Sequence, residues 1–203
     1  MIRLYRFPYS TNVERVTLAL AHKDVEFESV WVDPADRSEV MRVSGQELVP
    51  VVEADGEVLA DSTRIVRRLE AWQPDPPLYP AAASPRAEVH VFEDWFNRVW
   101  KGPPNAIADE RGRSDPDRVA IGAWVADMRD SLDRFEALLD GRDHLMGHDF
   151  SAADLCAYPF LKYGLLGLEP GDDDPFHAVL VEYLPLEGHP RVADWIRRVG
   201  ERA

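Results

Sequence analysis

The length and composition of the chain are those of an ordinary globular protein. Its 203 residues can form one large domain or two small ones, and 45% hydrophobic with 30% charged residues supply a core and a polar surface. The net charge of -14 repels phosphate backbones and anionic lipid head groups, which argues against nucleic acids and membranes as partners.

Cysteine usage and the first residues favour a cytoplasmic protein. The amino terminus lacks the zones of a signal peptide, and no apolar run approaches the roughly 20 residues that span a bilayer. The single cysteine, Cys156, cannot form an internal disulfide and is expected in a core. No cysteine and histidine group has the spacing of zinc ligands, His144 and His148 included, so we expect no metal.

The first part of the chain predicts alternating strands and helices. Runs with period two and β-branched residues indicate strands, and apolar residues three or four positions apart indicate helices. Asp55-Gly56, between two such runs, suits a tight hairpin turn. The predicted elements are strand 2–6, helix 12–23, strand 27–32, helix 37–43, strands 49–53 and 57–60, and helix 63–73, a βαβαββα order.

A proline-rich stretch from Pro74 to Pro80 divides the chain. Four of these seven residues are proline, which blocks both helix continuation and central-strand pairing. Downstream, apolar residues recur at helical spacing. We therefore predict an α/β domain over residues 1–76 and an all-helical domain over residues 82–203.

A polar turn, Pro8-Tyr9-Ser10, precedes the first predicted helix. A hydroxyl at a helix start lies beside unpaired N–H groups and the positive end of the helix dipole, an environment that stabilises an anion. Ser10 is therefore a candidate donor to a thiolate, although an isolated serine here is more often a plain cap. Tyr9, whose phenol is the more acidic donor, is the alternative.

Val49-Pro50 and Asp61-Ser62 are two further candidate binding motifs. A proline at a strand entry either starts the strand in the trans form or is cis, and a cis bond lets the main chain of Val49 pair with a peptide ligand. At the last predicted helix, Asp61 and the Ser62 hydroxyl can hold an amino group and a carboxylate, respectively. In isolation, this second motif is also a plain cap.

Together these motifs resemble the serine-type glutathione transferases (theta, phi and zeta-like) over essentially the whole chain. The resemblance implies a thioredoxin-like N-terminal domain that binds glutathione, followed by an all-α helical-bundle domain that shapes the pocket for a small hydrophobic electrophile. It implies a cis Val49–Pro50 bond, glutathione binding by Val49, Pro50, Asp61 and Ser62, and a thiolate stabilised by Ser10. A homodimer that acts in detoxification is also implied.

The resemblance leaves the activity open. The leading interpretation is transfer of the glutathione sulfur to the electrophile. Glutathione-dependent isomerisation, peroxide reduction, a non-catalytic ligand-binding role and the use of another low-molecular-weight thiol are the alternatives. The chain departs from the family pattern at Leu48, where a glutamine or lysine often precedes the Val-Pro, so one ligand contact is predicted to be lost. Arg37 lies near a position that holds the glycyl carboxylate in some relatives, with a solvated surface arginine as its alternative.

The helical domain carries both structural and pocket candidates. Phe150-Ser151 and Asp154-Leu155 match the family's capping box and hydrophobic staple. The acidic run Asp172-Asp173-Asp174 is expected to be a solvated loop. Aromatic stripes are more often core than pocket, but some of these side chains are candidates for the electrophile pocket. The pocket candidates are Tyr9, Asn12, Trp95, Trp100 and Tyr163.

Overall fold

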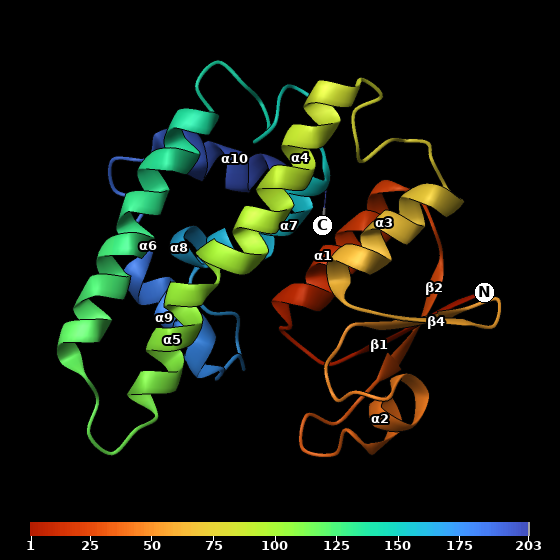
Figure 1. Ribbon diagram of the computed structural model, residues 1–203, viewed down its shortest axis with the longest axis horizontal. Coiled ribbons are helices and arrows are strands. Elements are labelled where there is room, and N and C mark those ends of the chain that lie inside the picture. Colours follow the sequence, from red (N-terminus) through yellow and green to blue (C-terminus); the bar gives the residue numbers. More distant parts are fainter. Residues whose placement is uncertain (203) are drawn as a thin grey trace. The chain divides into compact units, whose positions relative to one another are not determined.

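Figure 1 shows a computed structural model of the protein, which describes residues 1–202. The chain divides into two compact units. The first comprises Met1–Tyr79 together with Arg202, and the second comprises Pro80–Glu201.

The first unit is a four-stranded mixed sheet with helices, in the strand order β2-β1-β3-β4. β1 runs parallel to β2 and antiparallel to β3, which forms a hairpin with β4. α1 and α3 pack side by side, whereas α2 lies toward the opposite side of the strands (Figure 1). The elements are β1 Ile2–Arg6, α1 Thr11–His22, β2 Phe27–Trp31, α2 Ser38–Ser44, β3 Val51–Ala54, β4 Glu57–Ala60 and α3 Ser62–Trp72. The predicted βαβαββα order is confirmed.

The β3–β4 hairpin forms where its turn residues predict. Asp55 and Gly56 have φ angles of 50° and 82°, the two positive values that a type I′ turn needs. Such a turn matches the twist of the flanking strands and fixes their register. Val51 therefore lies opposite Ala60, and in the neighbouring pair opposite Tyr5.

This register brings three connections to one end of the sheet. β1 ends where β3 begins, and β4 ends beside the same point, because Tyr5, Val51 and Ala60 are in register. The loop that follows β1, the residues that precede β3 and the start of α3 therefore lie at the same end. These are the segments that carry the predicted binding motifs.

Lys23 anchors the proline-rich stretch to the first unit. Its side chain is fully buried, and Nζ donates to Oε2 of Glu70 at 2.6 Å, to the Gln73 carbonyl at 2.6 Å and to the Pro76 carbonyl at 3.0 Å. The same Glu70 oxygen accepts the Leu78 amide at 3.1 Å. A buried ammonium needs such compensation, so Lys23 joins the ends of α1 and α3 to the chain that leaves the unit.

The second unit is helical, as predicted. Its helices are α4 Ala83–Trp95, the π-helical turn η1 Phe96–Trp100, α5 Gly102–Arg111, α6 Arg118–Leu138, α7 Ala152–Leu161, α8 Tyr163–Leu166, α9 Pro175–Tyr183 and α10 Pro190–Gly200. α6 returns along α5, and α7 packs against α4, α9 and α10 (Figure 1). All ten residues of α7 are buried, which makes this helix the centre of the unit.

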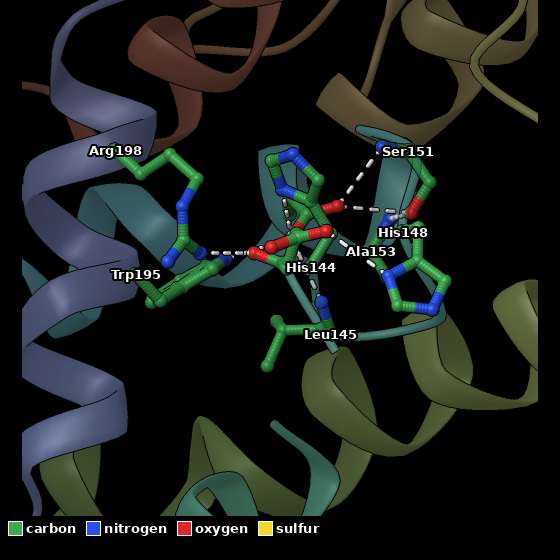
Figure 2. Close-up of polar contacts among 9 residues, drawn as sticks. His144, Leu145, His148, Ser151, Ala153, Trp195 and Arg198 are labelled. Atoms are coloured by element: carbon green, nitrogen blue, oxygen red, sulfur yellow. Dashed lines mark hydrogen bonds and ion pairs between the residues drawn. The ribbon is translucent and has the colours of Figure 1, made fainter. Parts of the chain in front are cut away.

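Asp154 on α7 links the capping box to the last helix. The predicted box is confirmed: the Ser151 hydroxyl caps the helix start, and Asp154 Oδ2 accepts the Ser151 amide at 2.9 Å. The other carboxylate oxygen accepts the Leu145 amide at 3.1 Å and the indole N–H of Trp195 at 2.8 Å. Figure 2 shows these partners, with Trp195 approaching from α10.

Candidate functional site

Ser10 caps α1 at the end of the sheet where the three connections meet. Its Oγ accepts the Val13 amide at 3.4 Å, and Glu14 provides a carboxylate in the first turn. A serine hydroxyl that accepts from the backbone still has its own proton to donate. The geometry is therefore that of a helix cap that can also donate to an anion in front of the helix.

Tyr9 and Asn12 flank Ser10 and are half-buried. Tyr9 has a φ of 62°, in the left-handed region that side-chain-bearing residues seldom occupy. This backbone conformation turns the chain between β1 and α1. Strained residues of this kind, which typically cost about 1–3 kcal/mol, cluster at functional sites.

The peptide bond between Val49 and Pro50 is cis, and both residues are buried. The preceding loop is fixed by Gln46, whose side-chain amide donates to the Leu48 carbonyl at 2.7 Å and accepts the Leu48 amide at 2.6 Å. The Leu48 side chain is left 68% exposed. An apolar group therefore projects beside Val49 where relatives often carry a polar one.

Asp61 and Ser62 form the start of α3. Asp61 has a φ of 76°, is exposed, and caps the helix by accepting the Arg64 amide on Oδ1 at 2.9 Å. A carboxylate that caps with one oxygen keeps a second oxygen for a ligand ammonium group. Ser62, the first helical residue, is buried, and its hydroxyl lies 3.5 Å from Nη1 of Arg15.

Arg15 is the site-region residue that our sequence interpretation missed. It lies on α1 next to the buried Val16, and it is itself 3% exposed. A signal was present in the sequence, because an arginine interrupts an otherwise apolar helix face. Buried arginines are uncommon unless they are paired, so this residue merited attention.

Arg37 is held against the loop that follows β1. Nε donates to the Pro34 carbonyl at 3.0 Å, and the guanidinium lies 5.3 Å from the centre of the Phe7 ring. Arg37 is half-buried rather than freely solvated. Its charge therefore lies beside the same loop that carries Tyr9 and Ser10.

The three aromatic candidates of the helical unit have different environments. Trp95 lines a groove of about 930 Å³ between α4 and α6, with Phe92 and Leu138 among the other lining residues. Trp100 is 4% exposed and donates its indole N–H to Ser131 Oγ at 2.9 Å. The structure therefore corrects the assignment of Trp100 to a pocket wall, because its ring packs in the core.

Tyr163 requires the same correction, and it overturns the solvated-loop prediction for Asp172. Tyr163 is 1% exposed, and its hydroxyl donates to Asp172 Oδ2 at 3.0 Å. His177 Nδ1 lies 2.9 Å from that carboxylate, and its ring stacks on Tyr163. Asp172 is thus buried in a polar cluster, whereas Asp173 is exposed and Asp174 caps α9.

Cys156 is buried within α7, in agreement with its predicted place in a core. Across residues 1–202, no group of three or more histidine, cysteine or carboxylate side chains is arranged to hold a metal ion. Within the same residues, no helix is both long and apolar enough to cross a bilayer.

Comparison with known protein families decides what this arrangement belongs to. The profile of the glutathione S-transferase N-terminal domain matches residues 4–77, and that of the glutathione S-transferase C-terminal domain matches residues 125–203. The chain belongs to the glutathione S-transferase family.

Similar proteins show how varied this family is. The chain is 25% identical to Protein LigF of Sphingobium sp. strain SYK-6, over 99% of this chain and 90% of LigF. It is 27% identical to the FtsZ-localized protein A of Caulobacter vibrioides, over 92% of this chain and 87% of that protein. A crystal structure of a glutathione S-transferase from Rhodospirillum rubrum F11 matches with a TM-score of 0.75 and 29% identity, over 98% of this chain and 87% of that chain.

The crystal structure of LigF, described as a beta-etherase, matches with a TM-score of 0.80 at 22% identity, over 98% of this chain and 94% of that chain. This likeness concerns the fold. The transferase fold of the present chain is therefore a thioredoxin-like unit followed by a helical unit, and the family to which it belongs uses glutathione.

Proposed function

We propose that this glutathione S-transferase family protein joins the sulfur of glutathione to a small hydrophobic electrophile. The observation that carries the proposal is the register of the sheet, which brings Ser10, Val49–Pro50 and Asp61–Ser62 to one end. Two helices begin at that end, and the positive poles of their dipoles favour an anionic ligand. This local field counteracts the net charge of -14 on the chain as a whole.

The proposed ligand contacts follow the chemistry of the tripeptide. Asp61 accepts from the α-amino group of the γ-glutamyl end, while the Ser62 hydroxyl and the first amides of α3 bind its α-carboxylate. The main chain of Val49, before Pro50, pairs with the cysteinyl backbone. Arg37, held beside Phe7, pairs with the glycyl carboxylate.

The proposed chemistry begins with loss of the thiol proton to solvent. Ser10 donates a hydrogen bond to the resulting thiolate, and the start of α1 adds its dipole, which together can lower the thiol pKa by about one or two units. The sulfur lone pair then forms a bond to the electrophilic carbon. In a displacement the leaving group departs with its bonding electrons, and in an addition the substrate takes up a proton.

We propose that Tyr9 and Asn12 border the electrophile and that Trp95 is the aromatic candidate from the helical unit. Relatives of this family are generally dimers, and we extend a homodimer to this chain. We also infer a cytoplasmic location, because glutathione is kept reduced there.

A second candidate is a non-catalytic ligand-binding role, favoured by one observation. Leu48 presents an exposed apolar side chain beside Val49, where a polar contact to the ligand is expected in relatives. A relative named for its localisation to FtsZ rather than for a transferase activity fits the same interpretation. The two candidates differ in whether a bound thiol is activated.

The experiment that tests the proposal is an ultraviolet titration of the thiolate of bound glutathione. We expect the pKa of the bound thiol to lie about one to two units below that of free glutathione, and Ser10→Ala to reverse most of this shift. Tyr9→Phe should leave the pKa lowered. A bound thiol that titrates like free glutathione supports the non-catalytic role, and reversal by Tyr9→Phe alone transfers the donor role to Tyr9.

Turnover assays then separate the reaction classes. A chlorodinitrobenzene reports sulfur transfer, an organic hydroperoxide reports peroxide reduction, and a cis-dienoic acid reports isomerisation. The proposal expects measurable transfer that Ser10→Ala reduces by about tenfold or more. A protein that catalyses only isomerisation or peroxide reduction contradicts the transfer assignment.

A further inference from the structure

Arg15 is a buried guanidinium that the proposed reaction does not use. It lies on α1 beside Val13 and Val16, on the face of the helix that is otherwise apolar apart from Thr11. An arginine stays protonated in proteins, and a buried charge is tolerated when hydrogen bonds compensate it. Its retention on this face points to a role beyond packing.

One contact of Arg15 reaches the start of α3. Nη1 lies 3.5 Å from the Ser62 hydroxyl oxygen, and both side chains are buried. A guanidinium only donates, so the Ser62 oxygen is the acceptor in this contact. The hydroxyl has a single proton, which is then available to be donated to another group.

We infer that Arg15 is a positioning residue that orients the Ser62 hydroxyl toward the α-carboxylate of the γ-glutamyl end of glutathione. The inference rests on the proposed function and adds to it a source of selectivity. A positive charge behind the hydroxyl favours a carboxylate as its acceptor, and the dipole of α3 acts in the same direction. Asp61, one residue earlier, carries the opposite charge for the ammonium group.

Two altered tripeptides isolate this contact. Glutaryl-cysteinyl-glycine keeps the carboxylate and lacks the α-amino group, whereas γ-aminobutyryl-cysteinyl-glycine keeps the amino group and lacks the carboxylate. Calorimetric titration of the full-length protein should show that Arg15→Gln weakens binding of glutathione and of the glutaryl tripeptide about tenfold. The affinity for the γ-aminobutyryl tripeptide should not change, and Arg15→Lys should restore part of the loss.

A double-mutant cycle tests whether Arg15 acts through Ser62. In a Ser62→Ala background, the effect of Arg15→Gln on glutathione binding should fall below about twofold, because the hydroxyl to be oriented is gone. Arg68→Gln is the control: Arg68 is also on α3, but it pairs with Glu57 at 2.7 Å. This variant should leave all three affinities unchanged.

Equal weakening of all three tripeptides by Arg15→Gln, or a full tenfold effect without the Ser62 hydroxyl, overturns the inference and leaves the proposed function standing. Failure of the wild-type protein to bind any of the tripeptides at millimolar concentration overturns both. If Arg15→Gln does not fold, Ser62→Ala alone decides the question. It must lose the preference for the glutaryl over the γ-aminobutyryl tripeptide, and retention of that preference contradicts the inference.

Discussion

Trp195 donates its indole N–H to Asp154 at 2.8 Å, and this bond joins α10 to α7. The Asp154 carboxylate is 0% exposed, and besides the indole it accepts the amides of Leu145 and Ser151 and the Ser151 hydroxyl. A carboxylate that serves a capping box alone stabilises one helix start. Here the same group also fixes the last helix and the loop before α7 (Figure 2).

Asp154→Ala is therefore expected to destabilise the protein by about 3 kcal/mol or more, because several buried donors lose their acceptor together. Urea denaturation followed by tryptophan fluorescence measures the change. Asp149→Ala, an exposed aspartate in the preceding loop, is the matched control and should cost less than about 0.5 kcal/mol. Similar losses in the two variants would show that the network contributes little.

Lys23→Met is expected to destabilise the protein by about 3 kcal/mol, because it leaves the Glu70 carboxylate without its buried counter-charge. Glu70→Gln in the same chain should recover part of the loss, since the remaining group is then neutral. Thermal unfolding of the two single variants and the double variant supplies the coupling energy. Additive effects of the two substitutions would contradict a direct coupling between Lys23 and Glu70.

His22 should make stability fall as the pH is lowered. Burial is the largest cause that lowers the pKa of His22 from its ordinary value of 6.5; nearby Arg202 and Lys23 lower it further, while the Pro77 backbone and Glu70 oppose the shift. The unfolded chain therefore takes up this proton at a higher pH than the folded chain does. The contribution is fully present above pH 6.5 and is lost as the pH falls below that value.

The measurement is the free energy of unfolding of the wild-type protein and of His22→Gln at a series of pH values. The wild-type protein should lose more stability than the variant between about pH 7.5 and pH 5.5. Parallel curves for the two proteins would mean that His22 does not contribute to the pH dependence.

Leu48→Gln should tighten glutathione binding about threefold, because it returns a polar donor to the exposed position beside Val49. The loop itself should not change, since Gln46 holds the Leu48 backbone and not its side chain. Leu48→Met, which keeps an apolar group of similar volume, is the control. Equal affinities of the three proteins would show that this position does not face the ligand.

The sequence predicted the fold well because local signals agreed with the tertiary structure. The Asp55-Gly56 turn, the proline-rich stretch and the capping box at Ser151 each have a local physical cause, and each is present in the structure. The burial of Asp172 and Tyr163 had no such cause, because it depends on His177 in a different helix. Spacing along one segment does not reveal a partner that the fold supplies.

The candidate site was predicted in its parts and not in their connections. Ser10 and Asp61 were visible as helix starts, because capping residues are a local pattern. The contact between Arg15 and Ser62 joins residues 47 positions apart, and only the packing of α1 on α3 brings them together. Trp100 was misassigned for the same reason, since its partner Ser131 lies on α6.

The central claim is that one end of the sheet in the first unit binds glutathione through Asp61 and the residues around it. Calorimetric titration with glutathione, comparing the wild-type protein with Asp61→Asn and Asp117→Asn, tests it most directly. Both substitutions remove one charge from an aspartate that caps a helix, α3 in one case and α6 in the other, and asparagine preserves the cap. We expect saturable binding that Asp61→Asn weakens about tenfold and Asp117→Asn leaves unchanged, whereas absent binding or equal affinities in all three proteins would contradict the assignment.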